Sequence, residues 1–216
     1  MASQIAHIIY CQKYLSRIKE NNFYDAPDLA TRKNLLDNKD EFMLGSVFPD
    51  IRRIAPELKR SDTHLCYDPI DLNFTGMSAF NAGWKFHLYA DMKREEILGK
   101  YKFYSFDKTA DFWHIPSKLL EDEIVYSQYD NWEKLVNYFN NPPYLNQLVS
   151  RETFLLWYAI NARYMEKKPN SKSMGIFISK LPKLAGAAVD IVEIVDDLRN
   201  NKKILEILKK VTEEIV

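Results

Sequence analysis

Apolar residues recur at the spacing of an α-helix through most of this 216-residue chain, and no alternating pattern persists for more than a few residues. A spacing of three to four residues places apolar side chains on one helix face, whereas a half-buried strand needs a period of two. The chain has only six glycines, and straight-chain residues with little glycine favour helices over turn-rich sheet. We therefore predict an all-α protein, built as a multi-helix bundle.

Capping residues and prolines set the expected helix boundaries. Ser3 is a candidate N-cap for the first helix, and Thr75 or Ser78 for a long apolar helix. Pro49 lacks the backbone donor that a helix interior needs, so residues 48–51 should end the preceding helix. The expected helices span residues 4–19, 29–37, 41–45, 79–101, 116–139, 151–167, 182–199 and 202–215. We also expect a turn at 25–28, a connecting loop with short helical turns at 52–71, loops at 140–143 and 168–171, and a short strand at 100–106.

Length and charge narrow the class of protein. The chain is 46% apolar and 28% charged, and at this length it can bury a core without disulfides. We expect one helical domain over residues 1–216, in which residues 1–115 hold the candidate site and residues 116–216 add packing helices. The 30 basic and 30 acidic residues cancel, which argues against a long nucleic acid as partner.

Cysteine usage and hydropathy favour a cytoplasmic protein. Cys11 and Cys66 are too few for a disulfide framework, and we interpret both as buried or partly buried thiols in a reducing compartment. The beginning of the chain shows no secretion signal, and no apolar run is long enough to cross a bilayer. Small apolar residues at 184–192 would suit close helix packing, including a homodimer contact through the C-terminal helices.

The first candidate site residues are His87 and Asp91 in the long apolar helix. They stand four residues apart, so an imidazole and a carboxylate share one helix face. This pair could hold one cation from the same side. Taken alone, the more common explanation is a histidine that hydrogen-bonds an aspartate one turn later.

Three other residues extend this pair. Asp50 follows a proline in a forced turn, His64 lies in a polar loop, and His7 lies in the first helix. Each has an ordinary explanation: a helix cap, a surface histidine and a histidine beside the core. A metal site explains all of them together, because histidine nitrogen and aspartate oxygen are usual ligands of zinc and are accepted by manganese and iron. We predict one or two bound divalent ions, with zinc as the preferred metal.

The order of these residues is similar to that of the zinc-dependent phospholipase C family, which is related to fungal single-strand nucleases of the same all-helical fold. The similarity covers about residues 1–95. It consists of a helical histidine near the start, a Gly-x-x-x-Pro-Asp segment, a Thr-His pair and a His-x-x-x-Asp helix. In this chain these are His7, residues 45–50, residues 63–64 and residues 87–91.

The resemblance implies a phospholipase C type of fold and a set of roles. Asp50, His64, His87 and Asp91 would bind one metal ion. His7 and Asp91 would serve a second ion, so that Asp91 bridges the two. Asp50 would also be the catalytic base near the attacking water, with a low pKa.

The chain departs from the family pattern in its second half. The family places a further histidine after the helical aspartate and then a His-x-x-x-Glu pair. This chain has Ile97 and Lys100 in the first region, and His114 is followed four residues later by Lys118. We therefore expect an incomplete metal cluster and interpret His114 as a packed, structural residue.

These observations favour a metal-dependent phosphoesterase or phosphodiesterase that acts on a small phosphoester substrate. Four basic residues between positions 50 and 64 could receive its phosphate, or could simply form a solvated cluster: Arg52, Arg53, Lys59 and Arg60. The HD phosphohydrolases are a second class, but they need an adjacent His-Asp pair that this sequence lacks. A third possibility is a non-enzymatic helical module whose metal site is structural or vestigial.

Overall fold

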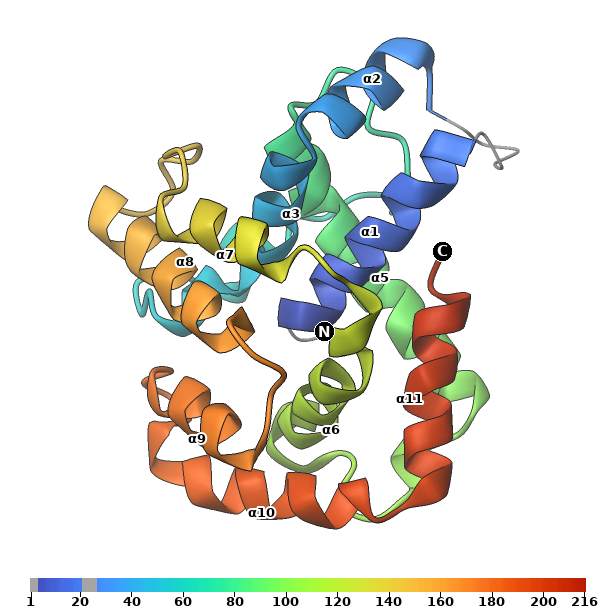
Figure 1. Ribbon diagram of the computed structural model, residues 1–216, viewed down its shortest axis with the longest axis vertical. Helices are drawn as coiled ribbons and strands as arrows, with labels where there is room; N and C mark the ends of the chain where they lie inside the picture. Colours follow the sequence, from blue (N-terminus) through green and yellow to red (C-terminus); the bar gives the residue numbers. More distant parts are fainter. Residues whose placement is uncertain (1–3, 21–26) are drawn as a thin grey trace.

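The computed structural model describes residues 4–20 and 27–216, and these ranges form a helical bundle with no strand (Figure 1). The predicted all-α class is confirmed. None of the helices in these ranges combines the length and hydrophobicity that a membrane span requires. The α-helices are α1 (Gln4–Glu20), α2 (Leu29–Asp37), α3 (Lys39–Val47), α4 (Arg60–Thr63), α5 (Ala79–Lys100), α6 (Asp111–Val125), α7 (Trp132–Asn140), α8 (Arg151–Met165), α9 (Ser171–Ser179), α10 (Ala188–Arg199) and α11 (Lys202–Glu214), and the short 3-10 helices are η1 (Phe48–Arg53), η2 (Phe103–Ser105), η3 (Tyr126–Gln128) and η4 (Ala185–Ala187).

Side-chain caps start several helices as expected. The Ser78 hydroxyl accepts a hydrogen bond of 3.2 Å from a backbone N–H in the first turn of α5, so Ser78 rather than Thr75 is the cap. The Asp28 carboxylate accepts two backbone N–H groups of α2. Ser3 and residues 25–26 of the predicted turn lie outside the described residues. As predicted, α3 ends just before Pro49, where η1 follows.

The single helix predicted over residues 116–139 is wrong. Helix α6 ends at Val125, and α7 begins at Trp132. Between them the rings of Tyr126 and Trp132 stack with centroids 4.7 Å apart, and the Trp132 indole donates to the Tyr126 carbonyl at 3.0 Å. The apolar period continues through this region, so the break comes from tertiary contacts that a periodicity cannot reveal.

Three other elements differ from prediction. The helix expected over 182–199 begins only with α10, because tight turns onto the Leu181 carbonyl and then η4 occupy its first residues. The strand expected at 100–106 is wrong, since Lys102 has a left-handed backbone (φ 50°) and η2 follows it. The sequence analysis also missed α9, which the Asn170 side chain caps.

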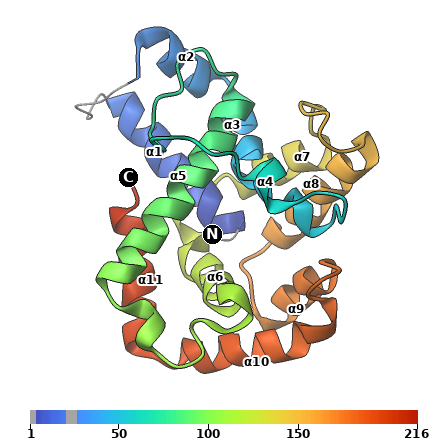
Figure 2. The same cartoon turned by 180° about the vertical axis from the view of Figure 1, so that it is seen from behind.

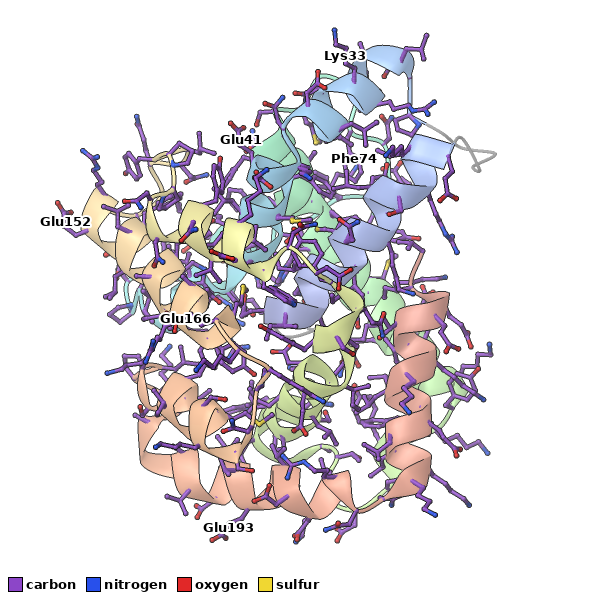
Figure 3. All side chains as sticks on the ribbon, in the orientation of Figure 1. Lys33, Glu41, Phe74, Glu152, Glu166 and Glu193 are labelled. Atoms are coloured by element: carbon purple, nitrogen blue, oxygen red, sulfur yellow. The ribbon has the colours of Figure 1, made fainter. Side chains whose placement is uncertain are left out.

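Most charged side chains lie at the surface of the bundle, and most large apolar side chains lie in its interior. Charged side chains such as Lys33, Glu152 and Glu193 are exposed at the periphery, whereas Phe74 is buried (Figure 3). Cys11 is buried and Cys66 is exposed. The prediction of two buried or partly buried thiols is therefore confirmed for Cys11 and wrong for Cys66, which lies in the loop after α4.

A close crossing of α3 and α5 forms the centre of the fold. At this crossing, a Cβ atom added to Gly45 would stand 2.0 Å from the Phe80 carbonyl oxygen, and one added to Gly83 would stand 2.0 Å from that of Phe42. Only glycine permits backbones to approach so closely. The two glycines therefore fix how α5, with His87 and Asp91, lies against α3.

Helix α1 lies in the interior, against α3, α5 and α6, and Figure 2 shows α5 passing over it. Helix α8 supports the end of α3: the Trp157 indole donates to the Val47 carbonyl at 3.0 Å, and the Tyr158 hydroxyl to that of Leu44 at 2.8 Å. These bonds satisfy carbonyls that a helix end leaves without intrahelical donors. Helices α10 and α11 cover α6 from outside.

Candidate metal centre

His87 and Asp91 lie one turn apart near the middle of α5. His87 Nε2 stands 3.4 Å from Asp91 Oδ2. The other ring nitrogen, Nδ1, is 2.7 Å from the Ser46 carbonyl oxygen. A carbonyl can only accept, so Nδ1 carries a proton, and Nε2 is the ring nitrogen that faces the carboxylate. This second contact sets both the ring orientation and the tautomer that a metal ligand needs.

Two further histidines converge on the same carboxylate. His7 comes from α1 and places Nε2 at 3.4 Å from Asp91 Oδ1. His64 follows α4 and places Nε2 at 3.9 Å from Asp91 Oδ2. The His7 and His87 rings stack with centroids 4.0 Å apart. Three segments far apart in sequence therefore direct imidazole nitrogens at one aspartate, as the sequence analysis expected for these four residues.

Burial determines the protonation states in this cluster. Desolvation, helped by the nearby His87, lowers the pKa of His7 to about 4 and that of His64 to about 3. Burial alone would raise the pKa of Asp91, but His87 and His7 hold it well below its usual range. At neutral pH His7 and His64 are neutral and the aspartate is ionised. Those are the forms that bind a metal.

The chemistry of this donor set fits a cation. One ligand atom each from His7, His87 and Asp91 lies within 4.8 Å of the others. The Nε2 atoms of His7, His64 and His87 are buried and have no hydrogen-bond partner among the described residues. Buried polar atoms are nearly always hydrogen-bonded, and three such exceptions at one place need a common explanation. A divalent cation held among them would be such an explanation.

Asp50 is buried beside the cluster but contacts other groups. Its Oδ2 accepts a hydrogen bond of 2.9 Å from the Gln4 side chain, and Oδ1 lies 3.1 Å from Arg53 Nε. Arg52 approaches the same oxygen at 3.8 Å. Burial disfavours the charge, yet Arg53, His87 and Arg52 hold the pKa of Asp50 well below its usual range. Its roles as ligand and catalytic base stay predictions.

The start of α6 carries features that the sequence analysis did not find. Phe112, Trp113 and His114 have left-handed backbones, with φ of 45°, 55° and 67°. The His114 ring packs edge-on against Tyr104 with centroids 4.3 Å apart, in keeping with a structural role. The buried Lys118 donates from Nζ to the Trp113 carbonyl at 2.9 Å. The only feature of this region noted from the sequence was that Lys118 follows His114 by four residues.

One of the contacts of Asp50 could have been predicted from residue spacing in the sequence. Arg53 is three residues from Asp50, a spacing that places both on one side of a tight helix. Gln4, from α1, had no such signal, because its partner is 46 residues away.

Searches among protein-family models, curated proteins and solved structures find no match to this chain.

Proposed function

We propose that this chain is a metal-dependent hydrolase of phosphoesters, with the cation held by His7, His64, His87 and Asp91. The observation that carries the proposal is the set of three buried imidazole nitrogens, without hydrogen-bond partners in the described residues, around one ionised carboxylate. Nitrogen and oxygen ligands of this kind favour zinc, and also accept manganese or iron.

Each residue has a part in the proposed chemistry. A divalent cation at this place lowers the pKa of a bound water and offsets charge on phosphoryl oxygens. The two oxygens of Asp91 face different histidines: Oδ1 faces His7, and Oδ2 faces His64 and His87. This division supports a bridging role between two ions. Asp50, kept ionised by Arg53, is the candidate proton acceptor.

One observation favours a non-enzymatic alternative, in which the metal only stabilises the fold. The Asp50 carboxylate is already engaged by Gln4 and Arg53. If these contacts persist with metal bound, Asp50 neither ligates nor accepts a proton. The site would then join α1, α4 and α5 without carrying out a reaction.

Metal analysis and hydrolysis of an aryl phosphodiester together test the proposal. The protein is stripped with chelator, dialysed against zinc, manganese or iron(II), and its metal content is measured by mass spectrometry. We expect one or two ions per chain and hydrolysis of bis(4-nitrophenyl) phosphate that disappears with the metal. Bound metal without hydrolysis of this or related aryl monoesters would favour the structural alternative, and failure to retain any metal would refute both.

A further inference from the structure

We propose that a cationic cavity beside the metal centre binds the substrate, and that it selects a phosphate ester with a compact aromatic group. The proposal rests on the proposed function for the reaction, but not for the binding. The cavity has a volume of about 310 Å³, and its lining includes the basic residues Arg52, Arg53 and Arg60 and the apolar residues Trp113, Ile115 and Leu181.

The charge of the cavity favours an anion. Three arginines and Lys183 line it, and none of the described lining residues is an aspartate or glutamate. Guanidinium groups present several N–H donors in a plane and match the oxygens of a phosphate group. Arg60 and His64 also belong to one turn, since the His64 amide donates to the Arg60 carbonyl at 2.8 Å. A cationic residue of the lining and a candidate metal ligand therefore come from the same helical turn.

A smaller cavity, lined in part by the same residues, lies against Asp50. It has a volume of about 20 Å³, enough for about one water molecule, and is lined by Gln4, Asp50 and Lys118. Arg53, Ile115 and Leu181 line both cavities. A phosphate group bound by the arginines would thus lie next to the carboxylate proposed to accept a proton.

The apolar residues of the lining select the organic group. Trp113 is 70% exposed, although it lines the cavity and belongs to the left-handed run at the start of α6. Left-handed backbones in large residues are costly and cluster at ligand-binding sites. Lys118 holds this segment through the Trp113 carbonyl. The indole is therefore presented to the cavity instead of being packed in the core, as a surface for a flat ring.

The volume limits the size of the ligand. At about 310 Å³ the cavity is at the lower end of small-molecule sites. Ile115 and Leu181, both buried, make an apolar floor that offers no hydrogen bonds from side chains. A phosphate joined to one ring system fits these features, whereas a long polymer or a long-chain lipid would extend beyond them.

Non-hydrolysed phosphonates test the proposal by binding rather than by turnover. Affinities of phenylphosphonate and methylphosphonate are measured by calorimetry, with zinc-loaded and zinc-free protein. We expect the phenyl compound to bind about tenfold more tightly. Trp113→Ala should abolish this preference and Trp113→Phe should retain it. Arg60→Ala should weaken both ligands, whereas Arg151→Ala, which removes an exposed charge from α8, should change neither.

Equal affinities for the two phosphonates, or a preference that persists in Trp113→Ala, would overturn the proposal. The proposed hydrolase function and the proposed cavity specificity can be refuted independently. A protein that binds no zinc but keeps the Trp113-dependent preference retains the cavity as an anion site and loses the hydrolase function. A protein that binds zinc and hydrolyses aryl diesters without that preference keeps its function and loses the proposed cavity specificity.

Discussion

The carbonyl oxygen of Ser46 lies 2.7 Å from Nδ1 of His87, so the packing of α3 on α5 also orients a candidate metal ligand. This contact depends on how closely the two helices approach. Gly45 and Gly83 permit that approach, because neither position has room for a Cβ atom. Stability and metal binding should therefore respond together to changes at the crossing.

Gly83→Ala should destabilise the protein by about 3 kcal/mol, the upper part of the range for overpacked cores, because its Cβ would stand 2.0 Å from the Phe42 carbonyl oxygen. Urea unfolding measures this change. Gly99→Ala is the matched control: Gly99 also lies in α5, and a Cβ there meets nothing within 4 Å. It should stabilise by roughly 0.5–1 kcal/mol. Equal midpoints for the two variants would contradict the close crossing.

Asp91→Asn should weaken metal binding by roughly a hundredfold or more, since loss of a mere partner of a ligand already costs 10- to 100-fold. The charge that faces His7, His64 and His87 is lost, while the shape of the side chain is kept. Titration with zinc measures the change. His114→Ala is the control and should bind zinc as the wild type does. Unchanged affinity in Asp91→Asn would refute the site, and weakened affinity in His114→Ala would extend it.

The metal-free protein should lose stability as the pH falls from about 6.5 to 4. Burial lowers the pKa of His7 from 6.5 to about 4 and that of His64 to about 3, so the unfolded chain binds protons in this interval that the folded chain does not. For His7 alone this corresponds to roughly 3 kcal/mol. The lowered pKa values of Asp50 and Asp91 add to this loss from about pH 5 downward, mostly below the interval, because unfolded aspartates titrate near 3.8.

Urea unfolding at a series of pH values, after removal of metal by a chelator, measures this effect. The double variant His7→Gln, His64→Gln should show a flatter dependence, since glutamine does not titrate. Similar unfolding midpoints for the wild type at pH 7 and pH 5 would show that these imidazoles are not buried in the neutral form.

Glu121→Gln should cost about 3–5 kcal/mol, because it removes the buried counter-ion of Arg94 and leaves that buried charge only the partly exposed Glu95 among its described partners. Arg94 Nε donates to Glu121 Oε2 at 2.8 Å, and both side chains are fully buried. The exposed pair of Lys93 and Glu96 has the same separation, so Glu96→Gln is the control and should change stability by less than about 1 kcal/mol. Thermal or urea unfolding compares the two, and losses of similar size would argue against burial of the first pair.

Helical periodicity sufficed to predict the long elements of the fold and failed where tertiary contacts decide. The predicted helices over 4–19 and 79–101 agree with α1 and α5, which are long enough to show a complete pattern. The break between α6 and α7 depends on the stacking of Tyr126 on Trp132, and the residues involved look equally apolar in a continuous helix. Short elements such as α9 give too few turns to be recognised.

The residues of the candidate site were predicted more completely than their contacts. Sequence order placed His7, His64, His87 and Asp91 together, and the structure brings their side chains to one place. The sequence order could not indicate that Asp50 would contact Gln4, since that hydrogen bond joins two segments that are distant in sequence. Homodimer formation, substrate and metal identity stay predictions.

The uneven burial of the four candidate ligands has a kinetic consequence for metal exchange. The His7 and His87 side chains are fully buried, whereas those of Asp91 and His64 are 10% and 8% exposed. Among the described residues, an ion held by this set would be most accessible from the Asp91 and His64 side, since the His7 and His87 side chains are fully buried. A bulky chelator should therefore extract it slowly, at a rate set by local opening of the helices, even where equilibrium strongly favours removal.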